Sequence, residues 1–235
     1  MNIVVGLCGD GQRFQSTYHQ PKWTIAYRGK TMIEWAVLTS RLPTDNLYFV
    51  VRQDHLTPHY LNILQSLGRI ITTPTKTSGP AHTALLAQPH LDPHLPFISL
   101  NCDQWMNWDP RSFLHAISST SHHYILTYHD TSSKASYART VANTTQVDLV
   151  VEKQPISTHA TAGIYHWHTT STFFQDCQQL INDGITTNGE SYIAPIYNYA
   201  IARGEQVHIW PLSPREFFPT GTPHDLNTLL DSNII

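Results

Sequence analysis

The chain has 235 residues, of which 40% are hydrophobic, and this length and composition suffice for one globular domain. Its 14 Lys and Arg against 17 Asp and Glu leave a net charge of −3 with histidine counted as neutral. Such a mildly acidic balance argues against the strongly basic face that broad binding to nucleic acid needs, so we expect no nucleic-acid partner. We predict a single domain that spans residues 1–235.

The cysteines are few: Cys8, Cys102 and Cys177 form no CxxC pair, and their odd number indicates neither a disulfide framework nor a zinc knuckle. Residues 1–5 lack the charged start and long apolar stretch of a secretion signal. No apolar run approaches the ~20 residues that a membrane span needs. We therefore expect a cytoplasmic protein with no membrane partner, and the sequence leaves homo-oligomerisation open.

The first hundred residues alternate between strand-like and helix-like segments, which is typical of a mostly parallel sheet flanked by helices. Thr31 and Glu34 form a predicted capping box at the start of the first helix. In chain order, the predicted elements are a strand at 2–5, a helix at 31–41, a strand at 47–51, a helix at 61–67, a strand at 69–72, a turn at 77–80, a short helix from Ala81 and a strand at 96–100.

The second half is less regular, and polar turns separate most of its predicted elements. Pro195 lies inside the last predicted helix and leaves the start of that helix undefined. The predicted strands are 123–128, 138–142, 147–152, 162–167 and 206–210, and the predicted helices are 171–182 and 191–202.

Histidine is frequent, with 15 in the chain, and two pairs raise the question of a metal site. His122 and His123 are adjacent, while the spacing of His166 and His168 places both on one face of a strand. Neither pair has an obvious third ligand nearby. We therefore expect surface or core histidines rather than a zinc site.

A glycine-rich loop follows the first predicted strand and ends at Arg13. Glycines let the backbone approach a phosphate closely, and an arginine adds a bidentate cation. The loop lacks the Gly-Lys-Ser/Thr ending of a P-loop, and Phe14 stands where a dinucleotide fingerprint has its third glycine. By itself, the loop is as compatible with a simple tight turn as with a phosphate site.

Two charged residues add to this pattern. A lysine placed at the α-phosphate of a nucleotide stabilises charge that grows in the transition state, and Lys22 follows the glycines closely enough to do so. Asp103 closes the apolar run at 97–100, and ligands of open α/β sheets collect at the carboxyl ends of strands. An aspartate there suits Mg²⁺. The alternatives are a solvated surface lysine and a turn aspartate.

Together, these motifs resemble the nucleotidyltransferase family that makes nucleotide-sugars and related activated head groups, including glucose-1-phosphate thymidylyltransferases. The family pattern is G-x-G-x-R-F, P-K and G-K-x-M-I-E. Here it reads Gly9-Asp10-Gly11-Gln12-Arg13-Phe14, Pro21-Lys22 and Gly29-Lys30-Thr31-Met32-Ile33-Glu34. Later segments with the same resemblance are Thr77-Ser78-Gly79-Pro80-Ala81, Asn101-Cys102-Asp103-Gln104, Val151-Glu152-Lys153, Ala162-Gly163-Ile164-Tyr165, Asn188-Gly189-Glu190 and Gly221-Thr222-Pro223-His224-Asp225-Leu226.

The resemblance implies a three-layer α/β/α fold, Rossmann-like and of GT-A type, with a mostly parallel sheet and inserted acceptor-binding strands. It implies that a nucleoside monophosphate passes from an NTP to a sugar phosphate or related phosphomonoester, with release of pyrophosphate and with Mg²⁺ as cofactor. The resemblance to a subgroup of capsule and surface-glycan pathways implies that the product is a precursor of capsule or surface polysaccharides. The implied catalytic residues are Arg13, Lys22 and Asp103; the nucleotide-binding residues are Leu7, Gly9, Gly11, Arg13, Lys22, Gly79, Pro80, Ala81 and Asn101; the acceptor-binding residues are Glu152, Lys153, Gly163 and Glu190; and the metal ligands are Asp103 and Asp225.

One position departs from the family pattern. Many sugar-nucleotide members carry a second metal aspartate two residues before the Gly-Thr of the closing segment, where this chain has Pro219. Asp225 either replaces that ligand or serves as a helix N-terminal aspartate. Because of this departure, a non-catalytic nucleotide-binding homologue remains an alternative. Two other classes are less favoured. The chain lacks the third glycine expected of an NAD-dependent oxidoreductase, and it lacks the Asp-x-Asp motif that glycosyltransferases of similar fold usually carry.

Overall fold

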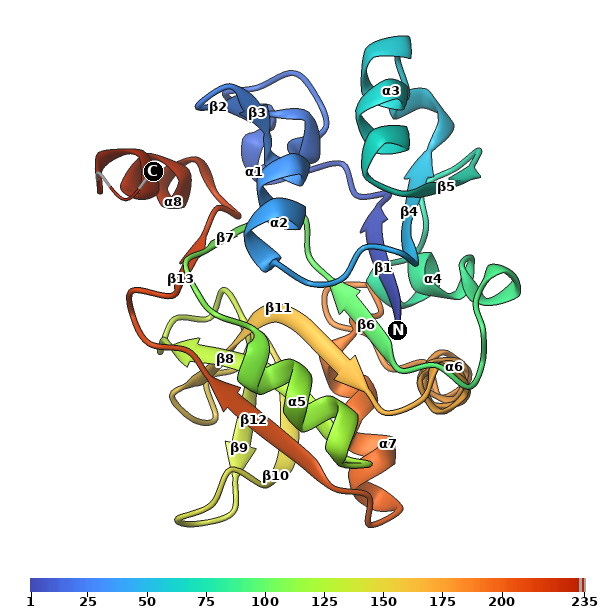
Figure 1. Ribbon diagram of the computed structural model, residues 1–235, viewed down its shortest axis with the longest axis vertical. Coiled ribbons are helices and arrows are strands. Elements are labelled where there is room, and N and C mark those ends of the chain that lie inside the picture. Colours follow the sequence, from blue (N-terminus) through green and yellow to red (C-terminus); the bar gives the residue numbers. More distant parts are fainter. Residues whose placement is uncertain (233, 235) are drawn as a thin grey trace.

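Nine strands of the computed structural model, which describes residues 1–232 and 234, form one mixed sheet (Figure 1). They are β1 (Asn2–Leu7), β4 (Leu47–Arg52), β5 (Arg69–Thr73), β6 (Phe97–Leu100), β8 (His123–His129), β9 (Ser136–Thr140), β10 (Val147–Glu152), β11 (His159–Trp167) and β12 (Val207–Pro211). The strand order is β10-β9-β11-β6-β1-β4-β5, with β8 paired to β11 and β12 paired to β8. β6, β1, β4 and β5 are parallel, while β11 joins β6 and β8 antiparallel.

Two short antiparallel pairs accompany the sheet: β2 (Ala26–Tyr27) with β3 (Lys30–Thr31), and β7 (Gln104–Met106) with β13 (Phe217–Pro219). The α-helices are α1 (Gln12–Gln15), α2 (Met32–Ser40), α3 (Pro58–Leu67), α4 (Pro80–Leu85), α5 (Arg111–Ser119), α6 (Thr170–Asn182), α7 (Tyr197–Ala202) and α8 (Pro223–Asp231). Short 3-10 turns occupy η1 (Lys22–Thr24), η2 (Gln53–His55), η3 (Gln88–His90) and η4 (Ala194–Ile196).

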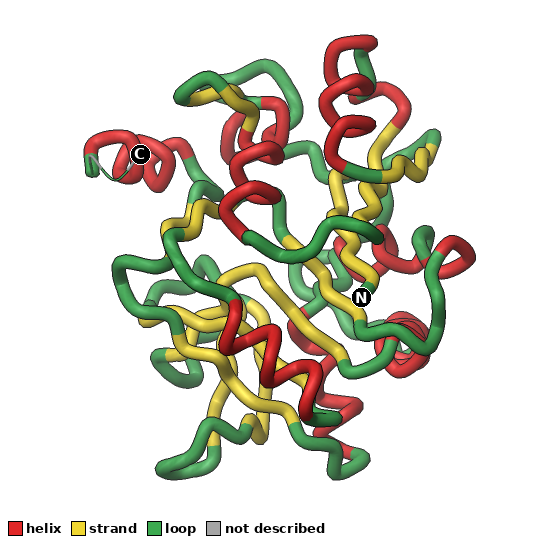
Figure 2. Tube along the Cα trace, in the orientation of Figure 1, coloured by secondary structure: helices red, strands yellow, loops and turns green. Residues whose placement is uncertain are grey.

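Helices cover both faces of the sheet. Side chains of β1 alternate between these two faces and so belong to two separate cores. Ile3 and Val5 belong to a core shared with α2, α3 and α5, and Val4 to a core shared with α4, α6 and α7. Helices therefore lie on either side of the strands in the tube view (Figure 2). This arrangement confirms the predicted three-layer α/β/α fold with a parallel N-terminal half.

The capping box predicted at Thr31 is present. The Thr31 amide donates to Glu34 Oε2 at 2.7 Å, and the Glu34 amide donates to Thr31 Oγ1 at 3.4 Å. The two groups satisfy backbone donors that the first turn of α2 leaves free. The predicted start of this helix is thereby confirmed.

The helices of the second half differ from the sequence predictions in two places. The helix predicted at 191–202 begins only at the 3-10 turn η4, because the Ser191 amide and carbonyl bond to Ser78 and Ala81 instead of to a helical turn. Helix α5 was missed, although Phe113 and Ile117 are buried one turn apart on it. Leu114 and Ala116 pack against the same core, so the helix has the apolar face of an amphipathic helix.

Helices that could cross a bilayer were sought within residues 1–232 and 234, and none combines the required length with sufficient apolar character.

Candidate active site

A cavity of about 1180 Å³ opens where β1 and β6 end. Ligands of open α/β sheets bind at the carboxyl ends of parallel strands, which is where this cavity lies. Single small-molecule sites occupy roughly 300–1000 Å³, so the space is sufficient for two substrates side by side. All but one of the predicted site residues line it, namely Leu7, Gly9, Gly11, Arg13, Lys22, Gly79, Pro80, Asn101, Asp103, Glu152, Lys153, Gly163, Glu190 and Asp225.

Ala81 is the exception. It is fully buried within the core beneath α4, and its amide donates to the Ser191 carbonyl at 3.0 Å. Its side chain therefore contributes to packing and is not among the residues that face the cavity.

The glycine loop brings Lys22 close to the end of β1. Gly11 has a left-handed φ of 62°, and a Cβ placed on it would lie 2.9 Å from Lys22 Cβ. Only glycine permits this conformation and this close contact together. Two residues further on, the exposed Arg13 forms no ion pair with any described residue and lines the same cavity.

Lys22 and Asp103 form an ion pair inside the cavity, with 2.7 Å between Nζ and Oδ2. Burial alone would lower the pKa of Lys22, but the charge and hydrogen bond of Asp103 raise it above its ordinary value. The lysine is therefore cationic at neutral pH. Burial also raises the pKa of the neighbouring Cys102 to about 11, so its thiol stays protonated and is a poor nucleophile.

The surroundings of Asp103 fit a Mg²⁺ ion that is shared with a substrate. No group of three or more His, Cys, Asp or Glu side chains among the described residues is arranged to hold a metal. Mg²⁺ rarely needs such a cage, because it uses one or two carboxylates and completes its shell with phosphate oxygens and water. Asp103 supplies a carboxylate of this kind at the edge of the cavity, 19% exposed.

Asp225 lies in the first turn of α8 and also lines the cavity. Its Oδ2 accepts from Thr222 Oγ1 at 2.6 Å, while its amide donates to Thr222 Oγ1 at 3.1 Å. This is the geometry of a helix N-terminal aspartate. Pro219, at the departure from the family pattern, pairs with Gln104 at the end of β13 and offers no ligand atom.

Two further glycines shape the cavity wall. Gly79 has a φ of 125°, and an added Cβ would lie 2.6 Å from the backbone of Ser191. Gly163 has a φ of 73°, and its Cβ would lie 2.7 Å from Asn101 Nδ2 and 2.5 Å from Gln104 Oε1. Side chains at either position would push these segments apart.

Three of the predicted acceptor-binding residues, Glu152, Lys153 and Glu190, come from the end of β10 and from the segment before η4. Glu152 accepts a short hydrogen bond from Ser136, and burial raises the pKa of its carboxyl above the ordinary value. Lys153 Nζ donates to Tyr192 Oη at 2.5 Å, and Tyr192 in turn donates to Glu190 at 2.9 Å. These groups face the same cavity as Lys22.

Sequence reasoning missed one network at the rim. Asp10, inside the glycine loop, accepts from Arg52 at 2.5 Å and from Lys76 at 2.7 Å. The hydrogen bond from Lys76 is the largest of the effects that lower the pKa of the Asp10 carboxyl. An acidic residue between two glycines was the available signal, but its two partners are distant in sequence.

Of the four aromatic residues near the predicted pocket, three are buried in hydrophobic clusters, namely Trp105, Tyr165 and Trp167. Tyr165 also lines the cavity, as Tyr192 does.

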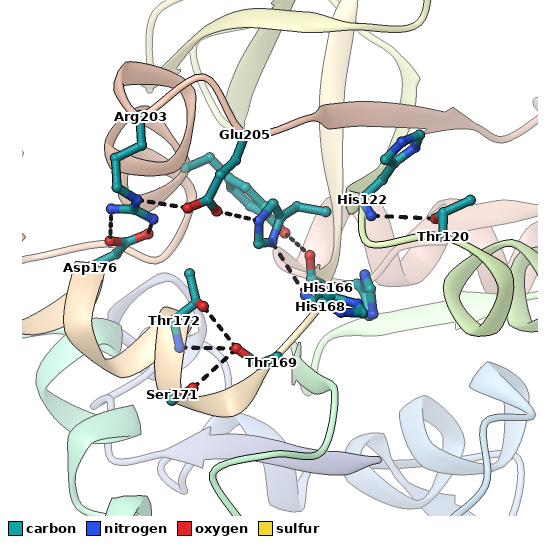
Figure 3. Close-up of polar contacts among 12 residues, drawn as sticks. Thr120, His122, His166, His168, Thr169, Ser171, Thr172, Asp176, Arg203 and Glu205 are labelled. Carbon is teal, nitrogen blue, oxygen red and sulfur yellow. Dashed lines mark hydrogen bonds and ion pairs between the residues drawn. The ribbon is translucent and has the colours of Figure 1, made fainter.

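None of the four paired histidines is among the residues that line the cavity. Figure 3 shows His122, His166 and His168 in the same region as the ion pair of Asp176 with Arg203. His166 is fully buried, and neither of its ring nitrogens has a hydrogen-bond partner among the described residues. His123 Nε2 lies 2.8 Å from Glu205 Oε2. His123 and His166 are therefore core histidines, while His122 and His168 are partly buried.

Comparisons with known proteins give a result at the level of structure. No protein-family model and no curated protein sequence matches the chain. A nucleoside-diphosphate-sugar pyrophosphorylase from Vibrio cholerae RC9 superposes with a TM-score of 0.81 at 25% identity, covering 98% of this chain and 100% of that one.

Two other solved structures share the fold at lower identity. A putative glucose-1-phosphate thymidylyltransferase from Bacillus anthracis has a TM-score of 0.78 at 19% identity over 100% of this chain and 96% of that one. The inositol-1-phosphate CTP transferase from T. maritima has a TM-score of 0.74 at 16% identity over 97% and 92%. The chain therefore has the fold of the sugar-phosphate nucleotidyltransferases, as its sequence motifs predicted.

Proposed function

We propose that the protein is a Mg²⁺-dependent nucleotidyltransferase, with residues 1–235 as one catalytic domain. It transfers a nucleoside monophosphate from an NTP to a sugar phosphate or related phosphomonoester and releases pyrophosphate. The sugar-phosphate nucleotidyltransferase fold supports this reaction class. The resemblance of the segment at 188–190 supports a role in supplying precursors of capsule or surface polysaccharides.

The observation that carries the proposal is the distribution of cations in one cavity. Arg13 and Lys22 line it beside the glycine loop, and Lys153 lines it from the end of β10. A reaction between two phosphate-bearing substrates needs cations for both of them. A cavity with a single cationic end would suit only one phosphate group.

In the proposed reaction, an oxygen of the acceptor phosphate attacks the α-phosphorus of the NTP. A new P–O bond forms, the bond from the α-phosphorus to the bridging oxygen breaks, and pyrophosphate leaves with that electron pair. The acceptor oxygen is already ionised, because the second pKa of a phosphomonoester is about 6. No general base is required, which agrees with the protonated state of the Cys102 thiol.

The side chains of the chain bind and orient the substrates. Lys22 neutralises the charge that grows on the α-phosphate oxygens, Arg13 holds the triphosphate, and Lys153 holds the acceptor phosphate. Asp103 orients Lys22 through their ion pair and is the proposed ligand of Mg²⁺. When bound, Mg²⁺ supplies positive charge that neutralises phosphate oxygens.

A pyrophosphate-release assay tests the proposal. CTP, UTP, dTTP, GTP and ATP are each combined with hexose phosphates, heptose phosphates and non-sugar phosphomonoesters, with Mg²⁺ and with EDTA. We expect one NTP–acceptor pair to release pyrophosphate only when Mg²⁺ is present. Each NTP without acceptor is the control for simple hydrolysis.

A non-catalytic nucleotide-binding homologue is the second candidate, and Pro219 favours it because this residue offers no metal-ligand atom. Calorimetric titration of the same NTPs, together with the pyrophosphate assay, distinguishes the transferase from the non-catalytic homologue. An NTP that binds tightly but yields no pyrophosphate with any acceptor would support the homologue and contradict the transferase.

A further inference from the structure

Lys153 has a backbone conformation that lysine rarely adopts. It follows directly after β10 and has a φ of 56°, in the left-handed region that favours glycine. A non-glycine residue in this region is strained and persists where its surroundings hold it there. Contacts around Lys153 must therefore hold it in this conformation.

The side chain of Lys153 is held by Tyr192. Its Nζ donates to Tyr192 Oη at 2.5 Å and lies 4.2 Å from the centre of the tyrosine ring. Tyr192 donates its own proton to Glu190 Oε2 at 2.9 Å. The hydroxyl group thus accepts from a cation and donates to an anion, an arrangement that fixes both of its hydrogen bonds.

The segment that carries Tyr192 is itself firmly attached. Asn188 and Gly189 have φ values of 52° and 78°, and Thr187 and Glu190 exchange backbone hydrogen bonds around them. Two consecutive residues with positive φ form the tight turn typical of Asn-Gly. The turn therefore gives Glu190 a defined position next to the tyrosine hydroxyl.

The same segment bonds to the turn that begins α4. The Ser191 amide donates to the Ser78 carbonyl at 3.0 Å, and the Ala81 amide donates to the Ser191 carbonyl at 3.0 Å. Gly79 lies between these two bonds and has room for no Cβ. Tyr192 is consequently anchored to the predicted nucleotide-binding segment, although it contacts the predicted acceptor-binding lysine.

We propose that Tyr192 is a positioning residue, which holds the Lys153 ammonium where it meets the phosphate group of the acceptor, while Glu190 orients the tyrosine hydroxyl. This inference rests on the proposed function. The lysine is pre-organised by the protein, so it loses less side-chain entropy when the phosphate binds. A lysine without this partner would sample many rotamers in a wide cavity.

The test compares Tyr192→Phe with Tyr199→Phe. Both changes remove a hydroxyl that donates to a carboxylate, but Tyr199 bonds to Asp183 outside the cavity lining. With the acceptor found in the pyrophosphate assay, we expect Tyr192→Phe to raise the acceptor KM about tenfold, since a hydrogen bond to a charged group is lost. The NTP KM should stay within about twofold of wild type, and Tyr199→Phe should leave both constants unchanged.

A second readout does not depend on turnover. Lysines labelled with ¹³C at Cε are followed by NMR during titration with inorganic phosphate, and Lys153→Ala assigns the Lys153 signal. We expect Tyr192→Phe to need about ten times more phosphate than wild type or Tyr199→Phe for half of the Lys153 shift. This result would support the inference even if no acceptor reacted, so failure of the proposed function is recognised separately.

Two outcomes would overturn the inference. A Tyr192→Phe titration that coincides with wild type would mean that the hydroxyl does not position Lys153. A titration midpoint at lower phosphate would mean that Tyr192 holds the lysine away from the phosphate.

Discussion

Two networks of charged side chains differ in burial, and their expected roles differ accordingly. In the cavity, Lys22 and Asp103 keep 25% and 19% of their side-chain surface exposed. Asp176, by contrast, is 1% exposed and is held by Arg203 through hydrogen bonds of 2.5 and 2.8 Å (Figure 3). Partly exposed charges can exchange one partner for a substrate phosphate, whereas a buried charge depends on its one partner.

The two networks also lie toward opposite ends of β6. The cavity follows the carboxyl end of this strand, where Asp103 lies, whereas His166 pairs with Ile98 near its start. The buried network connects β8, α6 and the turn before β12 through His123, Asp176 and Glu205. We therefore expect changes in the first network to affect activity and changes in the second to affect stability.

Lys22→Ala should have the largest effect. Removing a cation that stabilises transition-state charge lowers kcat by about 10²- to 10³-fold. The thermal midpoint should change little, because the pair with Asp103 is partly exposed. Pyrophosphate release and a thermal melt measure the two quantities. Lys30→Ala, outside the cavity lining, is the matched control, and equal loss in both variants would contradict the assigned role.

Arg203→Ala should produce the opposite pattern. It leaves the buried Asp176 carboxylate without its cation, which costs about 3 kcal/mol of unfolding free energy, or roughly 6–12 °C in melting temperature. Arg139→Ala is the control, since its pair with Asp148 is exposed and contributes less than about 1 kcal/mol. Denaturant unfolding and kcat of the folded variants are measured. Similar destabilisation of both variants would contradict the importance of burial.

This contrast also explains which parts could be predicted from the sequence. The cavity residues fall within short linear motifs, and parallel strands bring the ends of those motifs together. The capping box at Thr31 was equally local. The partners of Asp176 and His123 lie 27 and 82 residues away, and nothing in a single sequence pairs them.

The same limit applies within the candidate site. The segment at 188–190 resembles its family, but the contact of Tyr192 with Lys153 bridges 39 residues and required the structure. The start of the helix predicted at 191–202 was undefined for a related reason, because tertiary bonds from Ser191 to Ser78 and Ala81 replace helical ones. Local motifs therefore predicted which residues line the cavity better than how those residues contact one another.

Acid should weaken the buried region. Burial lowers the pKa of His166 well below its ordinary value, and the neighbouring His123 and His168 act in the same direction. In the unfolded chain, His166 binds a proton near pH 6.5, whereas in the folded chain it stays neutral. Its contribution to the unfolding free energy is therefore present above this pH and is lost as pH falls. Between pH 7.5 and 5.5, His166 alone should cost about 1.4 kcal/mol of unfolding free energy.

His166→Leu isolates this contribution. The variant removes a buried polar ring that has no hydrogen-bond partner among the described residues, so it should be at least as stable as wild type at pH 7.5. Its loss of stability between pH 7.5 and 5.5 should be smaller than that of wild type by about 1.4 kcal/mol. Denaturant unfolding at both pH values measures this, with the exposed His90→Leu as control. An unchanged pH dependence would assign the acid sensitivity to other groups.

Asp10→Asn should have the smallest effect, although Asp10, like Asp176, is bonded to arginine. Asp10 is 28% exposed and shares Arg52 with Asp54, so both of its partners remain hydrated when its charge is removed. The unfolding free energy should change by less than about 1 kcal/mol. Lys76 lines the cavity, and the substitution removes the negative charge of its partner Asp10. The cavity therefore becomes more positive, and the NTP KM should fall by roughly twofold to fivefold. A loss of stability as large as that of Arg203→Ala would show that burial does not separate the two networks.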